Sequence, residues 1–179
     1  LAHCPERIDP GNKNFTIENL PRVVGGIDKE SSLKAYEFYE KIINAPIREV
    51  SSVKAAEATK IMENTFRDIN IAFVNEMAKS FDKAGIDIME VINAAGTKFS
   101  FMAHYPGVGV GGHCIPVDPY YLIEKAKQSG FNHEFLKLAR NINESMPNYT
   151  VELLEKELGE LKGVKIGVLG RAYKANVDD

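Results

Sequence analysis

The chain has only two cysteines, no tryptophan, no long apolar run and no large excess of either charge. Cys4 and Cys114 are too few for a disulfide scaffold, so we expect free thiols and a cytoplasmic, reducing location. No apolar stretch reaches the roughly 18 residues of a membrane-spanning helix, and no basic segment followed by an apolar one indicates a signal peptide. A net charge of −3 favours neither nucleic acid nor an anionic membrane as a partner.

What is present is typical of a globular protein: 44% of the residues are apolar and 26% are charged. Residues 1–52 have the pattern of an α/β fragment. A short apolar strand is expected at residues 22–26 and ends in two glycines. A helix follows with Ser31 or Ser32 as its N-cap, and a second strand is expected at residues 48–52. The segment therefore predicts a βαβ unit.

The C-terminal segment Lys165–Gly170 resembles a buried parallel strand followed by a glycine turn. A lone strand leaves its backbone hydrogen-bonding groups unpaired. We therefore expect the chain to be a piece of a longer protein.

Residues 53–84 contain neither glycine nor proline and predict one long helix, ended by Gly85. At about 1.5 Å per residue it would be roughly 48 Å long. Its apolar residues recur at nearly helical spacing and cover much of its surface, which favours a partner: Met62, Phe66, Ile69, Phe73, Met77 and Phe81. We expect this helix to form a homodimer.

Further helices are predicted from Asp87, from Asp118–Pro119 to about residue 130, and over residues 133–158, the last interrupted or bent at Pro147.

The loop at Gly107–Gly112 contains a literal G-x-G-x-x-G, but no strand precedes it and no helix follows it directly. We interpret it instead as a loop whose missing side chains let a ligand lie against the backbone. It leads to Cys114, just upstream of a predicted helix N-terminus, which favours the thiolate. The alternative for a lone cysteine is a small buried apolar residue.

Asp118, Lys60 and Asn64 each have two interpretations. Asp118 is either an N-cap or a functional carboxylate. Lys60 and Asn64, one helical turn apart, either form a solvated face or donate hydrogen bonds to an oxyanion. Glu6 follows residues 1–4, which we expect to be the end of a strand, where α/β domains place ligand sites. Adjacent His–Cys pairs lack the spacing of metal ligands, so no metal site is expected.

Four segments, in family order, resemble the UDP-glucose/GDP-mannose dehydrogenase family, and most of all its UDP-N-acetylmannosamine branch. They are residues 4–11, residues 60–64 with Asn75–Glu76, residues 107–122 and residues 167–179. The resemblance implies a mainly α central domain between parts of Rossmann-like domains. Residues 1–52 would be the tail of an NAD-binding domain, residues 53–160 a helical dimerisation domain similar to the C-terminal domain of 6-phosphogluconate dehydrogenase, and residues 161–179 the start of a UDP-binding domain.

The resemblance also implies an activity: oxidation of the C6 alcohol of a UDP-sugar to a carboxylate, with NAD as cofactor. Cys114 would capture the aldehyde as a thiohemiacetal that becomes a thioester. Lys60 and Asn64 would steady oxyanions, Asp118 would order water, and Glu6 would activate water. The residues expected to bind substrate are Arg7, Gly109, Gly111, Gly112, His113, Tyr173 and Lys174, the last two contacting UDP.

Departures at Pro10, His113 and Val117 from the glucose-type members favour an acetamido sugar. UDP-N-acetylglucosamine and UDP-glucose 6-dehydrogenases remain alternatives. A different alternative is a catalytically idle helical dimerisation module. We expect the chain by itself neither to bind NAD tightly nor to turn over.

Overall fold

The computed structural model describes residues 1–170 and 172–174, which divide into two units. Residues 1–63 form the first unit and residues 64–174 the second. Helix α2, Val53–Ala84, begins in the first unit and ends in the second.

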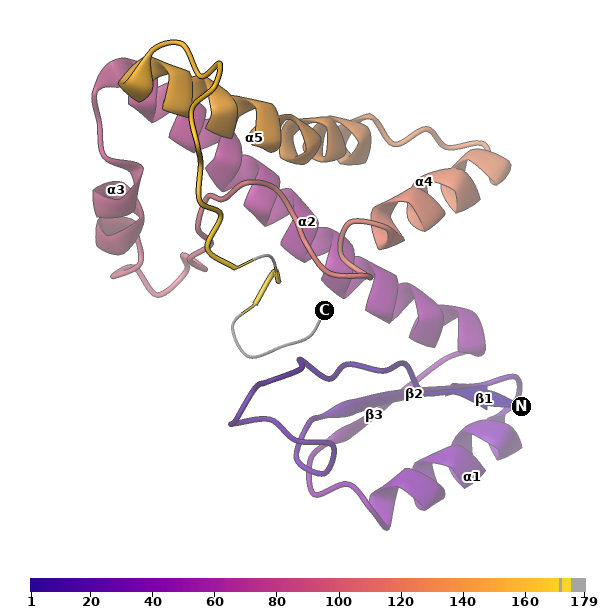
Figure 1. Cartoon of the computed structure of the whole chain (residues 1–179). Coiled ribbons are helices and arrows are strands. Elements are labelled where there is room, and N and C mark those ends of the chain that lie inside the picture. Colours follow the sequence, from indigo (N-terminus) through magenta and orange to yellow (C-terminus); the bar gives the residue numbers. More distant parts are fainter. Residues whose placement is uncertain (171, 175–179) are drawn as a thin grey trace. The chain divides into compact units, whose positions relative to one another are not determined.

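The first unit holds a three-stranded sheet and one helix (Figure 1). The strands are β1 (Ala2–His3), β2 (Arg22–Gly26) and β3 (Ile47–Val50), in the order β1-β2-β3. β1 runs antiparallel to β2, whereas β2 and β3 are parallel and joined through helix α1 (Lys29–Glu40). The predicted βαβ unit is confirmed.

The predicted N-cap of α1 is wrong. Asp28, not Ser31 or Ser32, caps the helix, and its carboxylate accepts a hydrogen bond of 2.7 Å from the Ser31 backbone N–H. The helix begins early because β2 ends in glycine: a Cβ on Gly26 would lie 2.3 Å from the Ser32 nitrogen. The serines therefore fall within the first turn of α1.

The second unit contains most of α2 together with α3 (Ile88–Ala95), α4 (Asp118–Gln128) and α5 (Glu134–Leu158). The predicted bounds of α2 are confirmed. Gly85 follows it with φ 69°, and the Ile86 N–H donates to the Phe81 carbonyl at 2.9 Å, as in a Schellman cap. Asp87 caps α3 by accepting from the Met89 N–H at 2.8 Å, as expected.

The helix expected over residues 133–158 is present as α5, and it continues through Pro147 without interruption. The strand predicted at Lys165–Gly170 is absent from the described residues, and the side chains of Val168 and Leu169 are 82% and 100% exposed. A strand requires a neighbouring strand to satisfy its backbone groups, and no described segment pairs with this one.

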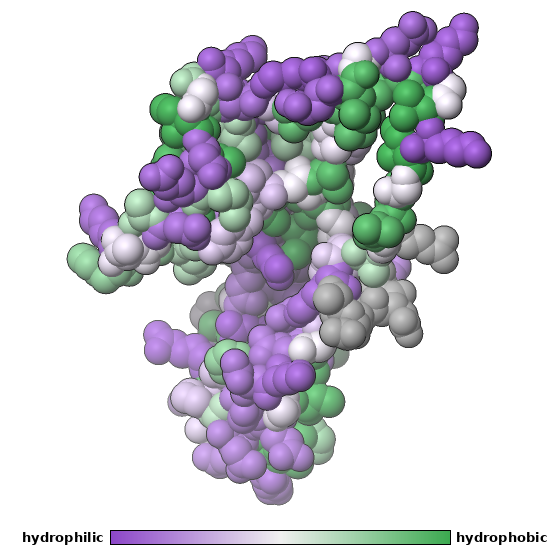
Figure 2. Space-filling view, turned by 60° about the vertical axis from the view of Figure 1, so that its left-hand side comes forward, coloured by the Kyte–Doolittle hydropathy of each residue, from purple (hydrophilic) through white to green (hydrophobic). Residues whose placement is uncertain are grey.

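Helix α2 buries polar residues together with small apolar ones. Thr65, Asp68 and Asn75 are at most 3% exposed, as are Ala72 and Val74, whereas Phe66 and Phe73 are about half exposed. Exposed apolar side chains form green patches between purple polar ones on the surface (Figure 2). Part of the apolar stripe therefore faces away from the core, unlike in the usual helix pattern. None of the helices among the described residues has the length and apolar character needed to cross a membrane.

Candidate active site

The glycine loop lines a cavity of about 630 Å³ in the second unit. Its walls are residues 107–113 together with Gly170, Ala172 and Tyr173. Gly109 and Gly112 have positive φ angles of 133° and 85°, which side chains rarely tolerate. A Cβ on Gly111 would lie 2.5 Å from the Tyr173 Cβ. The loop therefore needs these glycines for its conformation and for its close approach to Tyr173.

Cys114 follows this loop and is exposed. Its carbonyl accepts hydrogen bonds from the backbone N–H groups of Val117 and Asp118, at 3.0 and 2.8 Å, so the thiol-bearing residue lies one turn before α4. The interpretation of Cys114 as a small buried apolar residue is wrong. Cys4 differs: it is half-buried, and burial raises the pKa of its thiol despite a hydrogen bond with Tyr39.

Asp118 is not the N-cap of α4. Val117 occupies that position, and Asp118 is the first helical residue. Its carboxylate instead accepts a hydrogen bond of 2.5 Å from the Asn64 side-chain amide. The fold thus brings together two predicted catalytic residues that lie 54 positions apart in the chain.

Three other residues predicted for the site, Glu6, Arg7 and Lys60, belong to the first unit. Lys60 is half-buried on α2, one turn before Asn64. Arg7 forms an ion pair of 2.8 Å with Glu63 and donates a hydrogen bond of 2.8 Å to the Pro21 carbonyl. The two partners of the Arg7 side chain, Glu63 and the Pro21 carbonyl, therefore hold it within the first unit.

The carboxylate of Glu6 accepts hydrogen bonds of 2.7 Å from the backbone N–H groups of Arg7 and Ile8 and forms an ion pair of 3.3 Å with Arg22. Partial burial raises the pKa of Glu6, but these hydrogen bonds and the Arg22 charge outweigh it and lower the pKa overall. These contacts therefore stabilise the ionised form of Glu6. Arg22, which was not predicted as a site residue from the sequence, has a buried side chain that pairs with Glu6.

A buried polar cluster in the second unit, which was not predicted from the sequence, is formed by Asp68, Asn75, Arg140 and Asn143. One signal was present in the sequence: charged and amide residues recur at helical spacing, seven residues apart for Asp68 and Asn75 on α2 and three apart for Arg140 and Asn143 on α5. Such spacing is also typical of a solvated face, so the sequence did not distinguish the two.

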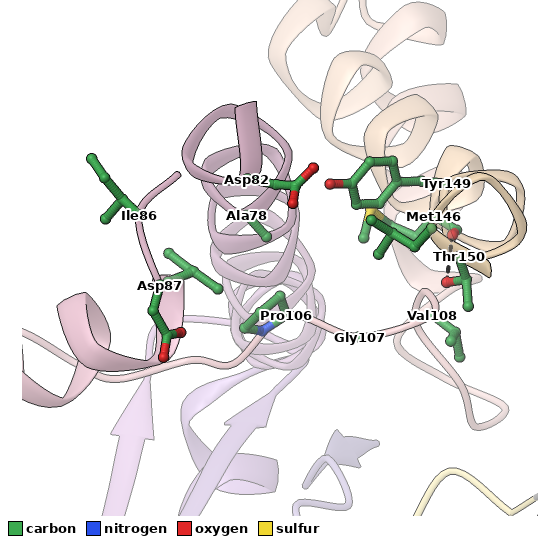
Figure 3. Close-up of a pocket in the computed structure, with 12 residues that line it drawn as sticks. Ala78, Asp82, Ile86, Asp87, Pro106, Gly107, Val108, Met146, Tyr149 and Thr150 are labelled. Carbon is green, nitrogen blue, oxygen red and sulfur yellow. Dashed lines mark hydrogen bonds between the residues drawn. The ribbon is translucent and has the colours of Figure 1, made fainter. Parts of the chain in front are cut away.

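A second cavity, of about 430 Å³, lies between the C-terminal half of α2 and α5 (Figure 3). Its lining is mostly apolar and includes Pro106, Gly107 and Val108, with Asp82 and Tyr149 as polar groups. Gly107 and Val108 line both cavities. The start of the glycine loop therefore forms a wall between them.

The described residues do not fit the pyrophosphate of a dinucleotide. After β2, a Cβ on Gly25 would lie 2.1 Å from the Ser52 carbonyl oxygen, so this glycine serves packing, and the α1 N-terminus already holds the Asp28 carboxylate. The Gly107 N–H is taken by the Asn75 side chain. No group of three or more histidine, cysteine, aspartate and glutamate residues in the described part of the chain could hold a metal ion.

Residues 54–145, just over half of the chain, match the sequence profile of the UDP-glucose/GDP-mannose dehydrogenase family, central domain. The chain belongs to this family.

Similar proteins include Protein CapL of Staphylococcus aureus, 43% identical over the whole chain. A UDP-N-acetyl-D-mannosamine dehydrogenase of Methanocaldococcus jannaschii is 41% identical over all of this chain, and a UDP-N-acetyl-D-glucosamine 6-dehydrogenase of Pseudomonas aeruginosa is 41% identical over 99% of it. The chain spans 40–43% of the length of these three relatives.

Among solved structures, the UDP-D-ManNAc dehydrogenase of Pyrococcus horikoshii superimposes with a TM-score of 0.81 at 38% identity. The match covers 88% of this chain and 37% of that protein. The predicted fold class, a mainly helical central domain with an α/β part, is confirmed by this likeness and by the helices and sheet described above.

Proposed function

We propose that this chain carries the catalytic loop of an NAD-dependent UDP-N-acetyl-D-mannosamine 6-dehydrogenase. The observation that carries the proposal is the Asn64–Asp118 hydrogen bond at the start of α4, one turn after the exposed Cys114. A nucleophile, a carboxylate and an amide donor are thus gathered at one helix N-terminus. Enzymes that capture and hydrolyse acyl intermediates use these three kinds of group.

In the proposed reaction, the Cys114 thiolate attacks the carbon of the aldehyde formed by the first oxidation of C6. The resulting thiohemiacetal carries a hydrogen on that carbon, and loss of a hydride leaves a thioester. Water then cleaves the C–S bond, which releases the carboxylate and returns the thiolate. NAD is the proposed hydride acceptor, and its site would lie outside the residues described here.

The remaining polar groups have proposed roles in the same steps. Asn64 donates an N–H to the oxyanion that develops on C6, and its bond to Asp118 fixes the orientation of the amide. Asp118 accepts protons from the attacking water. Lys60, one turn earlier on α2, would add a positive charge, and Glu6 would be a second base.

The UDP-sugar is proposed to lie along the glycine loop. The 630 Å³ cavity beside it has the size of a small-molecule site. Tyr173 and Lys174 are the proposed contacts for the nucleotide part, and Arg7 is a further proposed substrate contact. Relatives named for UDP-N-acetylmannosamine and for UDP-N-acetylglucosamine are equally similar to the chain. His113 and Val117 favour an acetamido sugar over glucose, and UDP-N-acetylglucosamine remains the alternative substrate.

A homodimer through α2 is also proposed, because Phe66 and Phe73 on its outer face are about half exposed. The proposed domain bounds are those given above, with the central domain at residues 53–160. A mechanism that depends on a free thiol favours a reducing compartment, which supports a cytoplasmic location. A catalytically idle dimerisation module is the second candidate, and the same exposed face favours it.

Replacing Cys114 distinguishes the two candidates. In a protein of the relatives' full length, Cys114→Ala should abolish formation of the uronic acid, and Cys4→Ala should leave it unchanged. Assays with UDP-N-acetylmannosamine, UDP-N-acetylglucosamine and UDP-glucose would then rank kcat/KM for the three sugars. Normal turnover by Cys114→Ala would refute the nucleophile, and equal kcat/KM values would refute the substrate.

A further inference from the structure

A chain of hydrogen bonds connects an ion pair between α2 and α5 to the first residue of the glycine loop. Arg140 donates to Asp68 at 2.6 Å, Asn143 donates to the same Asp68 oxygen at 2.9 Å, and Asn75 donates to Asn143 at 2.9 Å; these three bonds are buried. The chain ends at a part-buried bond, where the Asn75 side-chain oxygen accepts the Gly107 backbone N–H at 3.0 Å. The four residues whose side chains form the chain are at most 5% exposed.

The direction of every bond in this chain follows from its charged end. The carboxylate of Asp68 can only accept, so Asn143 must turn its NH₂ group toward Asp68; that group also donates to the Asp68 carbonyl, at 3.0 Å. The Asn143 oxygen then faces Asn75, which must present its own NH₂ group. The oxygen of Asn75 is left to accept from Gly107. The ion pair thus fixes the orientation of both amides.

The same cluster contacts the loop and the helix that flank Cys114. Gly109 lies against α5 so closely that a Cβ would be 3.3 Å from the Asn143 carbonyl oxygen. Beyond Cys114, the Arg140 guanidinium lies 5.7 Å from the ring centroid of Tyr120 on α4, and Glu144 accepts hydrogen bonds from Arg140 and from the Tyr120 hydroxyl. The segment from Gly107 to Tyr120 is therefore held at both ends.

Figure 3 shows Pro106 and Gly107 passing between α2, at Ala78, and α5, at Met146 and Tyr149. Gly107 and Val108 line both cavities, so little packing holds this backbone segment in place. The Asn75 bond is a directional contact at this point. Through this bond, Asn75 of α2 fixes the position of the first residue of the loop.

We propose that Asn75 and Asn143 are positioning residues that hold the glycine loop, and so the Cys114 thiol, in place. The inference rests on the proposed function for the role of Cys114. The positioning role itself depends only on contacts among the described residues. It predicts that the glycine loop is ordered by the side chains of Asn75 and Asn143.

Hydrogen exchange of the 179-residue chain tests the brace. In Asn75→Ala, the amides of residues 107–112 should exchange about tenfold faster or more, the scale expected when a backbone N–H loses one hydrogen bond. Ile92→Ala, on the buried side of α3, is the control, because Ile92 is 2% exposed and its aliphatic side chain forms no hydrogen bond with the cluster. That control should leave residues 107–112 protected relative to the rest of the second unit.

Alkylation of Cys114 in a Cys4→Ala background gives a second measurement, since Cys114 is then the only thiol. Its rate should change several-fold in Asn75→Ala and stay within twofold in Ile92→Ala. Asn75→Asp tests the direction of the hydrogen bonds in the chain. It keeps an acceptor for Gly107 but sets a carboxylate oxygen against the Asn143 oxygen, so it should also release the loop.

Equal protection of residues 107–112 in Asn75→Ala and Ile92→Ala, or wild-type exchange in Asn75→Asp, would overturn the proposal. Neither measurement uses a sugar or a cofactor. A released loop with normal turnover by Cys114→Ala would refute the proposed function alone. An unaffected loop with no turnover by Cys114→Ala would refute the brace alone.

Discussion

Replacing Arg140 by methionine should destabilise the second unit strongly, and more so at neutral than at acidic pH. The change removes the partner of Asp68, whose side chain is 1% exposed and 2.6 Å from the guanidinium. Breaking a buried pair by removing one partner costs about 3–5 kcal/mol, because the remaining charge is buried without compensation. Methionine keeps much of the volume, so the loss reports the charge.

The pH dependence follows from Asp68. Burial raises its pKa, and Arg140 and Asn143 only partly lower it again. Without Arg140 the folded-state pKa rises further above the unfolded value. A group whose folded pKa is raised stabilises at low pH and loses that contribution as the pH rises through the folded pKa. The deficit of Arg140→Met should therefore shrink when Asp68 is protonated.

Urea unfolding followed by circular dichroism at pH 7.5 and pH 5 would measure both effects. Arg67→Met is the control, since Arg67 is an exposed arginine on the same helix as Asp68, and its effect should stay within about 0.5 kcal/mol. The double variant Asp68→Leu/Arg140→Met should recover most of the lost stability. A deficit below about 1 kcal/mol, or one that does not change with pH, would refute the reasoning.

Four further results are expected. Iodoacetamide should alkylate Cys114 at least about tenfold faster than Cys4, because Cys4 is half-buried and its thiol pKa is raised; equal rates in a mass-spectrometric time course would contradict this. Gly111→Ala should displace Tyr173, since the new Cβ would lie 2.5 Å from the Tyr173 Cβ; unchanged hydrogen exchange of residues 170–174 would show that no displacement occurs. The chain should sediment as a dimer that Phe66→Glu dissociates, whereas a micromolar monomer would refute the α2 interface. Calorimetry of the chain with NAD should show no micromolar binding, because the α1 N-terminus and the Gly107 N–H already have protein partners.

Local features of the sequence were sufficient for much of the fold. The absence of glycine and proline over residues 53–84, followed by Gly85, predicted the bounds of α2. The strand–helix–strand pattern predicted the parallel pair β2–β3, and Asp87 predicted the start of α3. Helical periodicity, caps and glycine turns depend on residues only a few positions apart, so they are readable without tertiary contacts.

The candidate site depended on contacts between distant segments. Asp118 precedes proline at a helix start, which indicates an N-cap, yet its carboxylate accepts a hydrogen bond from Asn64 of α2, which lies 54 positions earlier in the chain. The strand predicted at residues 165–170 is absent because no described segment pairs with it.

The sequence by itself determined which segments are helical, where the glycine loop lies and which residues could carry chemistry. Only the tertiary structure decided which face of α2 is buried. Periodicity favours the apolar stripe, but Asp68 and Asn75 face inward, where they form hydrogen bonds with Arg140 and Asn143 of α5. Burying a polar group is costly unless it forms hydrogen bonds, and here the partners lie about 70 residues away in the sequence.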